Sequence, residues 1–237
     1  MLPPATRLAA LLLAGAVTLS AALSGCSGSD SHASDGKSPE QVLAQAKSTL
    51  DDTTGVNISL STKDLPSGVQ GIQDASGIGT HAPAFDGSIT VVLAGQPFDV
   101  PVIAVDGKVY AQIPLTPGWQ DVDPADYGAP DPAQLMSPDK GFSSLLAATT
   151  DLKKGDSVRG GADNSEILTE YTGTVPDTAV KNVIPSASGD FDATYTVTSD
   201  GELREATLTG VFYKDSDAMT YTIGFDDYGT DKDITAP

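Results

Sequence analysis

The amino-acid sequence predicts an α+β domain of about eight to ten mostly antiparallel strands and about three or four short helices, behind an apolar N-terminal segment. Alternating apolar and polar residues dominate much of the chain after residue 55, which is typical of antiparallel strands with one buried face. Two Asp-Gly pairs, Asp106-Gly107 and Asp200-Gly201, separate such stretches, as expected for tight hairpins. Proline next to a capping residue marks the expected helix starts.

Residues 1–25 are predicted to be a lipoprotein signal peptide. Arg7 is the only charged residue before Cys26, and the apolar run over 8–23 is shorter than the about 20 residues of a membrane-spanning helix. The run ends in Leu-Ser-Gly-Cys, which resembles the lipobox of bacterial lipoproteins. That resemblance implies cleavage before Cys26 and attachment of a diacylglycerol to its sulfur. The alternative is an ordinary signal peptide followed by an unrelated cysteine.

The composition excludes several functions and supports one domain. The formal net charge is −19, and Cys26 is the only cysteine. Strong acidity argues against binding nucleic acid or anionic lipid headgroups through charge, and no cysteine remains for a disulfide. Residues 26–37 are predicted to be a lipidated flexible tether. Residues 38–237 are predicted to form a single domain.

A helix is expected directly after the tether. Ser38 is suited to cap it, Pro39 fits the first helical position, and Gln41 completes a capping-box pattern. Gly55 ends the element. The apolar residues recur at helical spacing and form one stripe: Val42, Leu43, Ala46 and Leu50.

The next hundred residues are expected to be largely strands. Residues 56–62 alternate, whereas 65–85 contain so many glycines and prolines that we predict a loop or an irregular strand there. A three-stranded meander over 88–113 follows, with one face more apolar than the other. The candidate residues on it are Ile89, Val91, Leu93, Val100, Val102, Val109, Ala111 and Ile113.

The middle of the chain predicts short helices. Pro132 and Pro138 are the expected helix starts, preceded by the capping residues Asp131 and Ser137. Three apolar residues share one helical face: Phe142, Leu145 and Leu146.

Strands are expected again in the last third, over 166–175, 193–198 and 203–213, with a short helix over 177–184. In the final strand, three apolar residues alternate with polar ones: Met219, Tyr221 and Ile223.

No motif for catalysis, a metal or a cofactor is found in the sequence. His32 and His81 have no partners at ligand spacing, and no nucleophile elbow or phosphate-binding loop is present. The densest carboxylate cluster, over 226–233, lacks the spacing of a calcium loop. We therefore expect a protein that is not an enzyme and has neither a cofactor nor a metal.

One family resemblance covers essentially all of the chain after residue 25. Residues 119–121 read WQD and residues 131–147 read DPAQLMSPDKGFSSLLA, which resembles the LppX/LprA/LprF/LprG lipoproteins of mycobacteria and their relatives. The resemblance implies a fold similar to LolA and LolB. That fold is a bent antiparallel half-barrel whose concave face is covered by helices, with an apolar cavity between them.

The same resemblance implies a function. Members bind acylated glycolipids or phospholipids in the cavity and help to move them through the cell envelope, and a membrane lipid exporter is an implied partner. We therefore expect a lipid carrier anchored through Cys26 on the outer face of the cytoplasmic membrane. Moving a lipid chain into water costs about 0.8 kcal/mol of free energy per CH₂. Such a carrier therefore needs a large unfilled apolar surface.

The apolar residues of the meander, of the 142–146 segment and of the final strand are the candidate cavity lining. The abundant carboxylates also leave open an enzyme that acts on wall components, which would require carboxylates that converge in a cleft. For the candidate lining, sequence alone leaves two alternatives open. One is that these residues form an ordinary packed core. The other is a scaffold or ligand-binding lipoprotein with no large cavity.

Overall fold

The structure is a computed structural model that describes residues 36–127, 129–161 and 164–237. The predicted signal peptide, the lipid-attachment residue Cys26 and most of the predicted tether lie outside the described residues. Within them the chain forms eleven strands, three α-helices and two 3₁₀ helices. The helices are α1 (Pro39–Asp52), η1 (Pro124–Tyr127), η2 (Pro132–Met136), α2 (Ser143–Ala148) and α3 (Asp177–Val183). The strands are β1 (Gly55–Ser61), β2 (Gly71–Thr80), β3 (Ala84–Leu93), β4 (Gln96–Val105), β5 (Lys108–Ala111), β6 (Gln120–Val122), β7 (Thr150–Gly160), β8 (Glu166–Val175), β9 (Ser188–Thr198), β10 (Leu203–Val211) and β11 (Met219–Asp226).

All eleven strands belong to one open antiparallel sheet. Their order is β6-β5-β4-β3-β2-β1-β11-β10-β9-β8-β7, so each half of the sheet is a meander of strands that are neighbours in sequence. The halves meet where β1 pairs with β11. The Asp106-Gly107 hairpin forms as predicted, with φ of 54° and 72°, the positive values that a type I′ turn needs.

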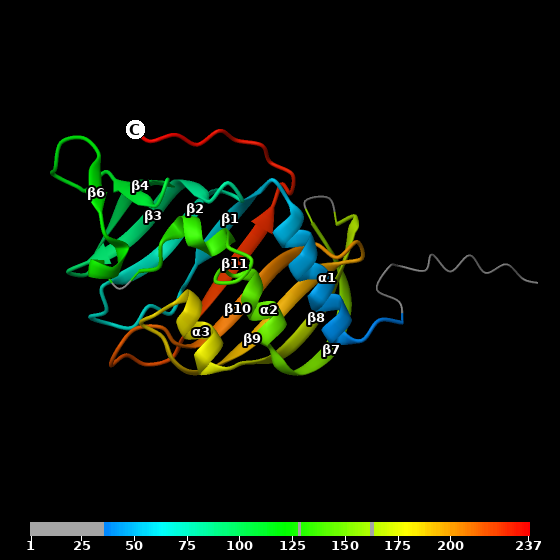
Figure 1. The fold of residues 1–237 in the computed structure, drawn as a ribbon. Helices are drawn as coiled ribbons and strands as arrows, with labels where there is room; N and C mark the ends of the chain where they lie inside the picture. The colour runs from blue at the N-terminus through cyan, green and yellow to red at the C-terminus, as the bar shows by residue number, and fades with distance from the viewer. Residues whose placement is uncertain (1–35, 128, 162–163) are drawn as a thin grey trace, which may run out of the picture. The chain divides into compact units, whose positions relative to one another are not determined.

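The α-helices cover one face of the curved sheet, over the half that contains β7–β11 (Figure 1). The first helix starts as the sequence predicts. Ser38 Oγ accepts a hydrogen bond from the Gln41 amide, and the Gln41 side chain accepts one from the Ser38 amide. Its stripe of four apolar residues is buried. Over the other half of the sheet, η2 packs against β2, β3 and β4. The fold is therefore the predicted α+β half-barrel.

Two apolar clusters lie on the helix-covered side of the sheet. The larger joins the three α-helices to strands β8–β11, and its largest fully buried side chains include Tyr171, Tyr195 and Phe191. Burial raises the pKa of Tyr195 to about 12, so its hydroxyl stays protonated and bonds Thr149 Oγ1 at 2.9 Å. The smaller cluster gathers apolar residues of β3, β4 and β5 around Ala133 of η2.

Three segments differ in detail from the sequence prediction. Residues 65–85, predicted to be a loop or an irregular strand, contain the ten-residue strand β2, whose register with β3 shifts between Ile72 and Asp74. Glycine in this strand allows close packing rather than breaking it. Gly77 lies opposite Gly87, and a Cβ on Gly87 would stand 2.2 Å from the Ser76 carbonyl oxygen. Residues 150–160, which the sequence did not mark as a strand, form the edge strand β7. Pro138 begins a turn, and the helix starts later, at Ser143.

Candidate functional site

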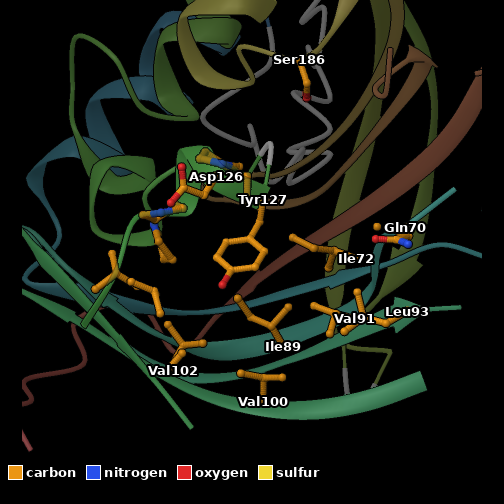
Figure 2. A pocket seen from close by; sticks show the side chains of 18 of the residues that line it. Gln70, Ile72, Ile89, Val91, Leu93, Val100, Val102, Asp126, Tyr127 and Ser186 are labelled. Atoms are coloured by element: carbon orange, nitrogen blue, oxygen red, sulfur yellow. The ribbon is translucent and has the colours of Figure 1, made fainter. Parts of the chain in front are cut away.

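An apolar cavity of about 430 Å³ lies against the β2–β6 half of the sheet. Its floor is made by β3, β4 and β5, and its opposite side by η1, the segment 129–132 and the residues after α3. Figure 2 shows Ile89, Val91, Val100 and Val102 on the strands below, with the Tyr127 ring above Ile89. The volume lies within the roughly 300–1,000 Å³ of small-molecule sites.

The strand alternation builds the apolar floor. Ile89 lies opposite Val100 across β3 and β4, so their side chains point to the same face. On β4, Val100 and Val102 are 9% and 5% exposed, and neighbouring Val109 of β5 is 6% exposed. These residues are shielded from water although the space above them is not filled by the chain, so the floor presents an aliphatic surface to a ligand.

The structure places nine of the candidate residues on the lining of this cavity. They are Ile89, Val91, Leu93, Val100, Val102, Val109, Ala111, Ile113 and Tyr221. It places the other five in the packed core that the α-helices share with β8–β11: Phe142, Leu145, Leu146, Met219 and Ile223. Leu145 and Leu146 are 0% and 1% exposed, so they hold α2 to the core instead of facing the cavity. Binding of lipid by the lining residues stays a prediction.

The rim of the cavity carries exposed groups on η1. Tyr127 is 64% exposed, and the Asp126 side chain also lines the cavity. Pro124, the first residue of η1, and Pro130, which follows this helix, add apolar surface. Leu93 at the end of β3 is 39% exposed. Apolar surface therefore continues from the floor out to solvent at the rim.

A closed set of hydrogen bonds forms one wall of the cavity, where β1 has ended and β2 is close to β11. The Ile72 amide donates to the Tyr213 hydroxyl at 2.9 Å, and the Tyr221 hydroxyl donates to the Ile72 carbonyl. The two hydroxyls are 2.8 Å apart. Because the Tyr221 hydroxyl has only one proton and donates it to the Ile72 carbonyl, the Tyr213 hydroxyl is the donor between the two tyrosines. Burial, with the neighbouring Tyr213, raises the pKa of Tyr221 far above its usual value, so the Tyr221 hydroxyl stays protonated at physiological pH.

Aromatic rings continue this wall into the main core. Phe212 packs edge-on against Tyr221, with ring centroids 4.7 Å apart, and Phe191 packs edge-on against Phe212 at the same distance. Phe212 and Tyr221 also line the cavity. They therefore separate the empty space over β2–β6 from the filled core under the α-helices.

Sequence reasoning missed nearly two thirds of the lining. No element was predicted over 124–130, and Pro132 was marked only as a helix start. Ile72 fell in the segment 65–85, predicted to be a loop or an irregular strand. Gly71 was a sequence signal that another group packs closely against the backbone there, because a Cβ on it would stand 2.6 Å from the Tyr213 ring. That position therefore has to stay free of a side chain for Tyr213 to reach the Ile72 amide.

A second hollow lies on the reverse face of β2 and β3. Val92 and Gln73 line it, while their chain neighbours Val91 and Ile72 line the apolar cavity. Lys63 and Gln70 also border this hollow, and its surface is about as polar as it is apolar. The two faces of β3 therefore meet different environments.

The described part of the chain contains no group of three or more His, Cys, Asp or Glu side chains placed to hold a metal ion. His81 lies with Nε2 2.8 Å from the Leu50 carbonyl oxygen near the end of α1. His32 lies outside the described residues. No helix in the described ranges is long and apolar enough to cross a membrane.

Comparison with known proteins identifies the family. The model of the LppX_LprAFG lipoproteins matches residues 38–236. The chain belongs to this family. The match takes in the sheet, the helices and the cavity.

Curated relatives and solved structures agree with that assignment. The chain is 29% identical to the lipoarabinomannan carrier protein LprG of Mycolicibacterium hassiacum over 98% of both chains. It is 28% identical to LprG of Mycobacterium leprae over 81% of this chain and 80% of that one. The crystal structure of LprF from Mycobacterium bovis has a TM-score of 0.67 at 13% identity, covering 84% of this chain and 96% of that one. The crystal structure of LppX from Mycobacterium tuberculosis has a TM-score of 0.61 at 17% identity, covering 83% of this chain and 98% of that one. The LprF and LppX structures therefore have the same fold as this chain.

Proposed function

We propose that this lipoprotein binds the acyl part of a lipid or glycolipid in the apolar cavity and carries it through the cell envelope. The observation that carries the proposal is the unfilled aliphatic floor formed by β3, β4 and β5. A packed core would bury these side chains against each other. The relatives named as lipoarabinomannan carriers support a lipidic cargo.

The physical reason for such a cavity is the hydrophobic effect. Transfer from a bilayer to water costs about 0.8 kcal/mol of free energy for each CH₂ group, so a free acyl chain does not cross an aqueous layer at a useful rate. A cavity lined by Ile89, Val100 and Val109 replaces the bilayer around the chain. No bond is made or broken, and the function needs neither a catalytic group nor a cofactor.

The proposal includes attachment of the protein to the outer face of the cytoplasmic membrane through acyl chains on Cys26. Residues 26–37 would then be a tether that leaves the domain free to receive cargo from a membrane lipid exporter. Growth with an alkyne-labelled palmitate tests the anchor. The wild type is expected to take up the label and Cys26→Ser to take up none. Equal labelling of both would show that Cys26 is not the attachment residue.

Lipid binding is tested with the full chain carrying Cys26→Ser, so that no covalent acyl chain competes for the cavity. The protein is delipidated, incubated with phospholipid vesicles and separated from them, and retained lipid is measured by mass spectrometry. We expect about one lipid per chain. A folded protein that retains no lipid would overturn the proposal and favour the scaffold alternative.

A matched pair of variants locates the site. Val91→Trp places a large ring in the cavity and is expected to abolish most lipid uptake. Val92→Trp makes the same change at the next residue, on the opposite face of β3, and is expected to leave uptake close to wild type. Both valines are half-buried, so the two variants perturb stability to a comparable extent. Loss of uptake in both, or in neither, would contradict binding at this cavity.

A further inference from the structure

We infer that exposed apolar side chains at the edge of the cavity insert into the surface of a lipid bilayer. The partner is the bilayer itself, and this contact is separate from the covalent anchor predicted at Cys26. The inference goes beyond the proposed function, because it concerns adhesion to a membrane whether or not a lipid enters the cavity.

The exposed apolar side chains of the domain gather beside the cavity. Among the described residues, five large apolar side chains are more than a third exposed. Leu93 and Tyr127 line the cavity (Figure 2), Phe98 lies opposite Val91 of the floor, and Leu115 directly follows two lining residues. These four residues form what we call the apolar rim: Leu93, Phe98, Leu115 and Tyr127.

Two connections at one end of the sheet present most of the apolar rim. Because β3, β4 and β5 are antiparallel neighbours, the β3–β4 turn and the β5–β6 loop lie at the same end. The sequence is LAGQPF over 93–98 and QIPLTPGW over 112–119, and neither stretch has a charged residue. Uncharged apolar tips on a chain with 32 acidic and 13 basic residues indicate a surface that is covered in use.

Leu115 is held in solvent by a strained turn. The Thr116 amide donates to the Ile113 carbonyl at 3.1 Å, with Pro114 and Leu115 in the middle of the turn. Leu115 has φ of 67°, and the third position of such a turn, a type II turn, ordinarily takes glycine. A leucine is strained in this region, and strained residues cluster at functional sites. The turn thus exposes a large apolar side chain where glycine would fit better.

The charge of this half of the domain favours apolar insertion over electrostatic attraction. Lys108 is the only lysine or arginine in residues 64–139, and it pairs with Asp121 at 2.7 Å. The neighbouring connection, residues 62–70, carries one lysine and one aspartate, whose charges cancel. Anionic headgroups and nucleic acid are bound by cations, which this surface lacks. Leucine and aromatic side chains are the groups that enter the boundary between headgroups and acyl chains.

The position of the apolar rim also favours a bilayer as its partner. The rim continues into the aliphatic floor of the cavity, so a bilayer seated on it would meet the cavity directly. The predicted tether of residues 26–37 would keep the domain within roughly 20 Å of the membrane. At this short distance even a weak insertion is favoured, because the effective concentration of the bilayer is high.

Flotation with lipid vesicles tests the contact. The protein is the chain from residue 26 with Cys26→Ser, which contains all described residues and lacks both the apolar N-terminal segment and an acyl anchor. We expect it to float with phosphatidylcholine vesicles. Phosphatidylglycerol in the vesicles should weaken flotation at low salt, and added salt should restore it, because anionic lipid repels an acidic protein.

Substitutions locate the contact. Leu115→Ser should lower partition onto phosphatidylcholine vesicles by about tenfold, which partial burial of one leucine accounts for. Val158→Ser is the matched control, because Val158 is 56% exposed on β7 at the opposite edge of the sheet, and it should float like the wild type. Leu115→Gly should float as poorly as Leu115→Ser while keeping a wild-type melting temperature, since glycine relieves the strain of the turn.

Trp119 reports which surface enters the membrane. It is the only tryptophan and lies at the end of the β5–β6 loop, four residues after Leu115. Vesicles of brominated phosphatidylcholine should quench its fluorescence when the protein binds. Quenching that persists after the vesicles are removed reports lipid held by the protein and is subtracted.

The outcomes separate this inference from the proposed function. Protein that does not float with phosphatidylcholine vesicles, or floats equally well after Leu115→Ser, overturns the inference. So does flotation that leaves Trp119 unquenched, or flotation that rises with phosphatidylglycerol and falls with salt, since each would place the contact elsewhere. A dimer that Leu115→Ser dissolves, without flotation, would assign the apolar rim to a second copy of the chain. Protein that floats through Leu115 but retains no lipid overturns the carrier function and leaves this inference standing.

Discussion

Two isoleucines that look equivalent in sequence should differ in what they contribute to stability. Ile223 of β11 is 6% exposed in the main core, whereas Ile89 of β3 is half-buried and borders the empty cavity. Truncation in a packed core removes contacts on all sides and leaves a void, so Ile223→Ala should lower the free energy of unfolding by about 3 kcal/mol. Ile89→Ala only enlarges an existing cavity and should lower it by about 1 kcal/mol.

Urea denaturation of the delipidated protein, followed by circular dichroism, measures both changes. With a slope of about 2 kcal/mol per M, the midpoint should fall by about 1.5 M for Ile223→Ala and by about 0.5 M for Ile89→Ala. The slopes should match that of the wild type, because the same surface is exposed on unfolding. Equal midpoint shifts for the two variants would refute the reasoning, since they would mean that Ile89 is packed in solution as tightly as Ile223.

Two further predictions concern the sheet. Gly87→Ala should lower the free energy of unfolding by about 2 kcal/mol or more, because the new Cβ would stand 2.2 Å from the Ser76 carbonyl oxygen. Thermal unfolding measures this loss of stability. Gly224→Ala is the control and should be milder, because the close contact of its new Cβ, at 2.6 Å, is with the Ser59 hydroxyl, which can rotate away. The Arg204 guanidinium donates two hydrogen bonds to Glu166, at 2.9 and 2.6 Å, and lowers the pKa of that carboxyl below its usual 4.5. The pair therefore stabilises the fold at neutral pH and is lost as the pH falls through the lowered pKa. Glu166→Gln should lower the free energy of unfolding by about 1 kcal/mol at pH 7 and by less at pH 3, and a deficit of the same size at both pH values would exclude this role.

Local signals in the sequence were sufficient for much of the fold. The capping box at Ser38 and Gln41 and the Asp106-Gly107 turn depend on contacts within a few residues, and the structure confirms them. The sequence left open whether 65–85 is a loop or an irregular strand, because the reason for the glycines of β2 is not local. Gly77 packs against Gly87 of the next strand, and the Phe85 ring lies over both.

The site was predictable to the extent that it depends on strand alternation. Alternation marks which face of β3, β4 and β5 is apolar, and those positions do line the cavity. It does not show what covers that face. Met219 and Ile223 of β11 have the same alternating pattern, but α-helices and aromatic rings fill the space around them. A filled space and an empty one differ in three-dimensional packing, which no single segment of the sequence records.

The pairing of β1 with β11 has a consequence for how the chain folds. These strands join the two ends of the domain, from Asn57–Asp226 to Ser61–Thr222, whereas the other strand pairs join neighbours in sequence or nearly so. Each half can assemble from local hairpins, but the join between them has to close a loop of almost the whole domain, which is slow. The last strand to be synthesised thus completes the middle of the sheet and not its edge. Until it arrives, β1 has an unpaired side open to other chains. A protein truncated before β11 would keep β1–β6 and β7–β10 but would lack the strand that pairs the two halves.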